Sequence, residues 1–121
     1  MKNLFIPYEL SVLAKQKGFN EPCFSFYYDN NFEFWKEQDV LKSIEFPFDT
    51  VSCNAPLYQQ IVDWFREKHN HVIMIKKDWH KGKLMGWECV IEQKDGFIDC
   101  GTFKTHNAAL NKAIEETFKL I

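Results

Sequence analysis

The densest group of side chains able to do chemistry is a basic segment with one indole, residues 76–83. It reads Lys-Lys-Asp-Trp-His-Lys-Gly-Lys, so four lysines accompany a single aspartate. Lysines can neutralise phosphates, and an exposed tryptophan can stack on an unpaired base. Five side chains form this candidate nucleic-acid contact: Lys76, Lys77, Trp79, Lys81 and Lys83. The plainer alternative is a solvated loop that charge keeps soluble, with Trp79 folded onto its neighbours.

Aromatic side chains gather in a second segment, which we predict to be a β-hairpin. Cys23 to Tyr28 reads as a strand, an Asp-Asn-Asn turn follows, and Phe32 to Lys36 alternates as the returning strand. A hairpin can bury only one face against a core unless another segment covers the other face. The uncovered face would bind a second copy of the chain or another protein. Its candidate residues are Tyr27, Tyr28 and Trp35. The alternative is that residues 37–50 fold over it.

Cysteine and histidine are numerous enough for a metal site, but their spacing does not favour one. The four cysteines are scattered, and only His69-x-His71 approaches a chelating doublet. Cys89 alternates with Trp87 and Ile91, which is typical of a small buried side chain and not of a nucleophile. No glycine-rich phosphate loop or nucleophile elbow occurs. We therefore predict no metal site, no cofactor and no catalytic residue, and we favour a protein that is not an enzyme.

The composition is that of an ordinary globular protein with a nearly balanced charge. The 121 residues are 45% hydrophobic and 26% charged, and the formal net charge is -2. That balance disfavours binding of nucleic acid or membrane by overall charge. The longest aliphatic run, Val72 to Ile75, is too short to span a bilayer. The N-terminus lacks the apolar core of a secretory signal, so we expect reduced thiols and a cytoplasmic location.

Two helices are predicted in the first seventy residues. The clearer one is capped by Asn54 and ended by Asn70 in the left-handed conformation. Its apolar positions follow the helical period: Leu57, Ile61, Trp64 and Phe65. The other is predicted from Pro7 to Lys17, with Gly18 as a left-handed stop.

The remaining residues predict a three-stranded antiparallel meander followed by a helix. The strands are expected over residues 71–77, 84–93 and 97–103. Gly82 and the Asp95-Gly96 pair supply the turn chemistry between them. Thr105 is expected to cap the last helix, residues 107–120.

Together these elements predict one α+β domain, residues 1–121. Its order is α-β-β-α-β-β-β-α, with an antiparallel sheet of four to five strands, two long helices on one face and the N-terminal helix at the side. Residues 37–44 could be a short helix or a loop. Phe46 to Thr50 reads as irregular, because Pro47 disfavours a helix interior and a central strand. The order from Leu57 onward matches double-stranded-RNA-binding domains in topology alone.

Two blocks of the sequence resemble proteins of a known group. The first is Phe5 to Leu10 with Lys17 to Phe24, and the second is Ala55 to Gln60 with Asp63 to Asn70. Both are similar to small uncharacterised proteins of gut Bacteroidales genomes and their phages or mobile elements. The resemblance implies a phage or mobile-element setting. It carries over no activity and assigns no site residue.

The sequence therefore predicts a small protein-interaction module without enzymatic activity. It would act through the aromatic hairpin, on another protein or as a homodimer. The alternative is a nucleic-acid-binding module that uses the basic segment 76–83. No membrane partner is expected.

Overall fold

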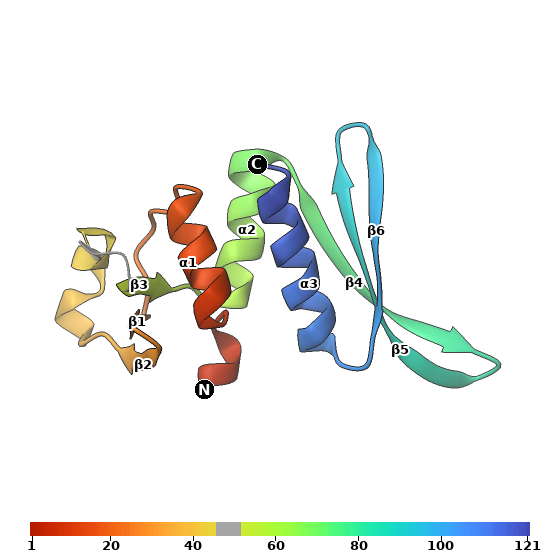
Figure 1. Ribbon diagram of the computed structural model, residues 1–121, viewed down its shortest axis with the longest axis horizontal. Helices are drawn as coiled ribbons and strands as arrows, with labels where there is room; N and C mark the ends of the chain where they lie inside the picture. Colours follow the sequence, from red (N-terminus) through yellow and green to blue (C-terminus); the bar gives the residue numbers. More distant parts are fainter. Residues whose placement is uncertain (46–51) are drawn as a thin grey trace. The chain divides into compact units, whose positions relative to one another are not determined.

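The computed structural model describes residues 1–45 and 52–121, whose elements are labelled in Figure 1. The helices are α1 (Tyr8–Gln16), α2 (Tyr58–His69) and α3 (His106–Lys119). The strands are β1 (Ser25–Tyr28), β2 (Asn31–Phe34), β3 (Ser52–Ala55), β4 (Val72–His80), β5 (Lys83–Gln93) and β6 (Gly96–Phe103). The predicted α+β class is confirmed. The stretch Phe46 to Thr50, predicted to be irregular, lies outside the described residues.

The predicted single sheet of four to five strands is wrong. The strands form two three-stranded antiparallel sheets, with the orders β2-β1-β3 and β4-β5-β6. The predicted element order lacks β3, which pairs with β1 so that Tyr27 lies opposite Cys53. The added strand completes the first sheet, and the meander forms the second by itself. The chain divides into two compact units, Met1–Ile61 and Val62–Ile121. The single domain over residues 1–121 stays a prediction.

In the first unit, α1 begins and ends one residue inside the predicted range 7–17, and the predicted stop at Gly18 is confirmed. Pro7 occupies the N-cap position. Proline has no backbone N–H, and a helix needs no donor at that position. Gly18 has a φ of 90°, a conformation that costs glycine little. The N–H of Phe19 then donates to the carbonyl of Ala14 at 2.9 Å. This closure satisfies a carbonyl that the last helical turn leaves without a partner.

The first sheet has an aromatic core on one face. Its buried members are Phe5, Tyr27, Cys53 and Ala55, with partly buried side chains packed against them, namely Tyr8, Val12, Phe32 and Leu57. The rings meet at tilted and edge-on angles, as between Tyr8 and Tyr27, whose centroids are 5.5 Å apart. Such angles are the favourable ones for aromatic pairs. Much of the aromatic content of the chain therefore serves packing.

Helix α2 begins later than the sequence predicts, and Asn54 does not cap it. Asn54 lies in β3, and the backbone N–H of Leu57 donates instead to Oε1 of Gln60 at 3.3 Å. A side chain three residues into the helix thus satisfies an amide at its start. The predicted end is confirmed, because Asn70 has a φ of 58°. The amide of His71 then donates to the carbonyl of Phe65 at 3.1 Å.

The second unit contains the predicted meander and final helix. Lys81 and Gly82 turn from β4 into β5 with φ of 51° and 74°, the signs of the tight turn that matches strand twist. The amide of Ala108 donates to Oγ1 of Thr105 at 3.0 Å, so the predicted cap of α3 is confirmed. Cys89, Ala109 and Ala113 are buried between α3 and the sheet, against partly buried side chains that include Ile73, Ile75 and Trp87.

Candidate functional site

The basic segment lies on a hairpin that extends beyond the third strand. β4 pairs with β5 from Val72 to His80, whereas β6 pairs with β5 only from Trp87 to Gln93. The end of the β4–β5 hairpin therefore continues past β6, as Figure 1 shows. The register shifts between Asp78 and Trp79, which leaves Met85 with no residue opposite. A bulge of this kind bends and twists a hairpin.

Lys77 organises the aromatic part of this hairpin. Its Nζ lies 5.8 Å from the ring centroid of Trp79 and 5.7 Å from that of Trp87. An ammonium ion over an indole face is attracted by the negative face of the ring. Trp79 is nevertheless 57% exposed. Trp79 therefore contacts Lys77 and still leaves more than half of its surface in solvent.

The other lysines of the hairpin stand in solvent. Lys76 has a long contact of 3.9 Å between its Nζ and Oε2 of Glu88, and exposed pairs of this kind contribute little. Lys81 lies in the turn, Lys83 follows it, and both are exposed. Within residues 1–45 and 52–121, no carboxylate forms an ion pair with either of them. The hairpin end thus carries positive charge that the described part of the protein does not neutralise.

The aromatic hairpin places its three predicted residues in three different environments. Tyr27 is 2% exposed, and its hydroxyl donates to the carbonyl of Ile6 at 2.9 Å. Burial raises the pKa of Tyr27 to about 12. Tyr28 is 61% exposed, because the next residue of a strand points to the other face. Trp35 is partly buried, and its indole N–H donates to Oδ1 of Asn54 at 3.0 Å.

A short 3-10 helix, Leu41–Glu45, is tied to the face of the first sheet that carries Trp35. Oγ of Ser43 accepts from the amide of Cys23 at 2.8 Å, and the carbonyl of Ser43 accepts from the side-chain amide of Asn54. Within residues 37–45, the structure therefore agrees with the alternative in which this segment folds over the hairpin. Phe24, just before β1, is nevertheless 56% exposed.

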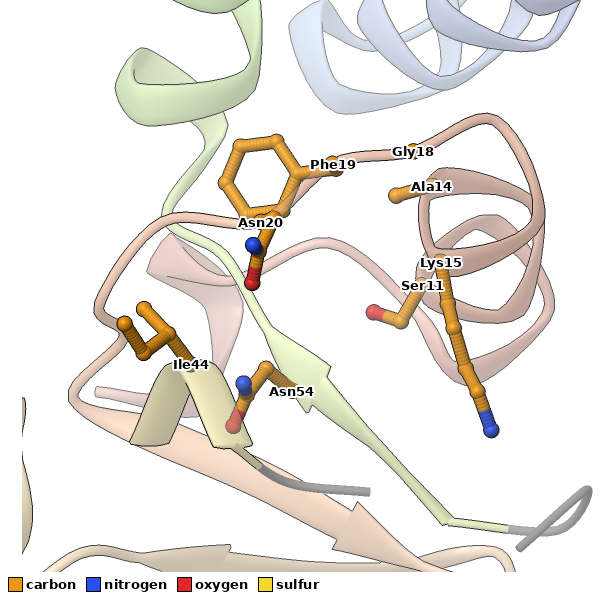
Figure 2. Close-up of a pocket in the computed structure, with 8 residues that line it drawn as sticks. All are labelled: Ser11, Ala14, Lys15, Gly18, Phe19, Asn20, Ile44 and Asn54. Atoms are coloured by element: carbon orange, nitrogen blue, oxygen red, sulfur yellow. The ribbon is translucent and has the colours of Figure 1, made fainter. Parts of the chain in front are cut away.

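The sequence did not predict a cavity beside α1 in the first unit. It has a volume of about 350 Å³ and is lined by residues of α1, the loop after it, the 3-10 helix and β3 (Figure 2). Its polar side chains hold the fold together. Nζ of Lys15 donates to the carbonyl of Ser52 at 3.1 Å, and Ser11 Oγ contacts the carbonyl of Ile6 at 3.4 Å. Oδ1 of Asn54 accepts from the indole N–H of Trp35, and Nδ2 of Asn54 donates to the carbonyl of Ser43. The sequence feature that could have indicated this cavity is Ser11, a small polar residue next to the apolar position Leu10 of α1.

The cysteines and histidines do not assemble into a metal centre in the described parts of the chain. No group of three or more potential ligands occurs there. All four cysteines are free thiols, and burial raises the pKa values of Cys23, Cys53 and Cys89 to about 12. A thiol with so high a pKa supplies almost no thiolate near neutral pH and is a poor nucleophile.

Comparisons with known proteins add no family to this description. No family model matches the chain, and no curated protein or solved structure is significantly similar to it. Among the described residues, no helix has the length and apolar character needed to cross a membrane. The two hairpins are therefore the parts of the molecule that carry the candidate functions.

Proposed function

We propose that this protein binds nucleic acid through the end of the β4–β5 hairpin. The observation that carries the proposal is an exposed indole, Trp79, within a cluster of lysines that no described carboxylate neutralises except through the long Lys76–Glu88 contact. Phosphates supply the matching negative charge, and bases supply flat faces for the ring. The burial of Tyr27 is what favours this function over the aromatic hairpin, because a buried ring cannot contact a partner.

The binding would be local, since the whole chain carries a net charge of -2. The hairpin offers four lysines, at positions 76, 77, 81 and 83. If all four contact phosphates, the logarithm of the binding constant should fall with the logarithm of the salt concentration with a slope of about -3. A single lysine contact would give a slope of about -1.

The test is fluorescence anisotropy of a labelled oligonucleotide across a salt series. The variant Lys81→Glu/Lys83→Glu should abolish binding at moderate salt, because it reverses two charges beside the turn. Lys94→Glu is a matched control, because Lys94 is also exposed and lies in the other turn of the same meander. Equal loss in the control variant, or binding that ignores salt, would contradict the proposal.

Protein interaction through the aromatic hairpin is the second candidate function. The observation in its favour is that Phe24, just before β1, and Tyr28, at its end, are 56% and 61% exposed. Such rings are typical of contact surfaces, for another protein or in a homodimer. The test is the light-scattering mass across a concentration series. A mass above the 14.4 kDa of one chain that Tyr28→Asp lowers would support it, and a constant monomer mass would exclude the homodimer.

A phage or mobile-element origin and a cytoplasmic location are also part of this proposal. The blocks that resemble proteins of phages and mobile elements support such an origin. The four free thiols support a cytoplasmic location, since that compartment keeps thiols reduced.

A further inference from the structure

We infer that the ligand of the β4–β5 hairpin is a single strand of nucleic acid, which lies along a line of rings from Trp79 toward the first residue of α3. The inference rests on the proposed function and specifies its ligand.

The rings and one lysine share a side of the hairpin. Lys77 and Trp79 are two residues apart on β4, and Lys77 lies opposite Trp87 on β5. Because side chains alternate along a strand, these three point to the same side. It is the side on which Ile73 and Ile75 pack with α3. The inner end of the line of rings therefore lies next to the part of the sheet that α3 covers.

The line reaches α3 through a ring contact. Trp87 meets His106 edge-on, with the ring centroids 5.0 Å apart and the planes at 83°. His106 is the first residue of α3 and is exposed. Trp79, Lys77, Trp87 and His106 thus follow one another from the hairpin end to the helix. Trp87 is partly buried and fixes the inner end of the line.

The acidic groups of the hairpin lie on the other side. Asp78 alternates with Lys77 and Trp79, and Glu88 lies opposite Lys76. The ring side of this stretch therefore carries Lys77 without a neighbouring carboxylate from either strand. A polyanion that approached the ring side would meet the ammonium ion first and the carboxylates last.

The rings select a single strand over a duplex. In a duplex each base is stacked between its neighbours, so a side chain cannot reach its flat face without disrupting the stack. In a single strand the bases are free to stack on an exposed aromatic ring. Trp79 is 57% exposed, which leaves ring surface open beyond its contact with Lys77. Lys77 lies over both indoles, so its ammonium ion can contact a phosphate next to a base stacked on Trp79.

The experiment compares a fluorescein-labelled oligo-dT of about ten nucleotides with the same strand in a duplex. We expect the single strand to bind at least about five-fold more tightly. Trp79→Ala should weaken single-strand binding by about five-fold or more, the loss of one stacked base, without changing the salt slope. Trp79→Tyr, which keeps a ring, should retain most of the affinity. Phe97→Ala is the matched control, since Phe97 is 68% exposed beside the other turn of the meander.

The outcomes separate the inference from the proposed function. Duplex binding as tight as single-strand binding, with Trp79→Ala unchanged, would overturn the inference and leave lysine-based binding in place. An equal loss in Trp79→Ala and Phe97→Ala would also overturn it, because the effect would then not belong to the line of rings. If neither the single strand nor the duplex binds at low salt, the proposed function itself is overturned.

Discussion

Removing the two hydroxyls that meet at the carbonyl of Ile6 should destabilise the protein by more than the sum of the single changes. The Tyr27 hydroxyl donates to this carbonyl at 2.9 Å, and Oγ of Ser11 lies 3.4 Å from it. All three residues are at most 2% exposed. Both hydroxyls therefore contact this carbonyl away from bulk solvent.

The magnitude follows from what each variant leaves behind. Tyr27→Phe removes one buried hydrogen bond, at a cost of about 1 kcal/mol. Ser11→Ala removes a longer and weaker one and should cost about 0.5 kcal/mol. In the double variant the carbonyl of Ile6 loses both donors, which adds a desolvation cost of about 1–3 kcal/mol. We expect the double variant to lose about 3 kcal/mol and to show a coupling of at least about 1 kcal/mol.

The assay is urea-induced unfolding of the wild type, the two single variants and the double variant, followed by tryptophan fluorescence. Tyr28→Phe is the control, because its hydroxyl is on a side chain that is 61% exposed. Its effect should stay within about 0.5 kcal/mol. Additive single effects, within about 0.5 kcal/mol, would refute the shared-carbonyl argument. A large effect of Tyr28→Phe would show that burial does not distinguish the two tyrosines.

Three further predictions concern the second unit. A Cβ at Gly86 would lie 2.6 Å from the carbonyl oxygen of Phe103, so Gly86→Ala should lower the free energy of unfolding by about 1–3 kcal/mol; an unchanged urea midpoint would contradict this. Thr105→Ala should cost about 1 kcal/mol by removing the cap of α3, and Thr105→Ser should restore it in the same assay. Desolvation, aided by the charge of His69, lowers the pKa of His71. The unfolded chain therefore takes up this proton first, and the free energy of unfolding should fall as the pH drops through about 6.5. Replacing His71 with Gln should flatten that pH dependence, and a parallel profile in the variant would refute the assignment.

The ends of the helices could be predicted from the sequence because their chemistry is local. Gly18 and Asn70 both have positive φ, and Oγ1 of Thr105 accepts from the amide of Ala108, three residues further on. Each of these positions depends on residues within one or two turns, which a single sequence displays. The meander was equally accessible, since its turns and its alternation lie within the strands themselves.

The third strand could not be predicted, because its stability comes from distant residues. Asn54 has the side chain of a good helix cap, and that local preference led to the wrong assignment. In the folded chain its amide bonds to Trp35 and Ser43, which lie 19 and 11 residues away. Pairing of β3 with β1 joins strands that β2 and the 3-10 helix Leu41–Glu45 separate in the sequence. Tertiary contacts of this range are not visible in one sequence.

The candidate sites also combine features that nearby residues determine with features that depend on distant residues. The hairpin carrying Lys81 and Gly82 was predicted at its correct place, whereas the position of Lys77 between two indoles depends on the register across the strands. For the aromatic hairpin, the alternation of a strand places Tyr27 and Tyr28 on opposite faces. Which face is covered depends on Phe5 and Tyr8, which come from another part of the chain.

The short turns of the meander also bear on how quickly it can form. Lys81-Gly82 and Lys94-Asp95 are each two residues long, so closing either loop orders few residues before the first cross-strand contacts form. Contacts between neighbours in sequence are the ones that form fastest. β1 and β3, by contrast, must meet across the residues that separate Tyr28 from Ser52. During refolding we expect protection of the β4–β5 amides from hydrogen exchange to precede protection of β3.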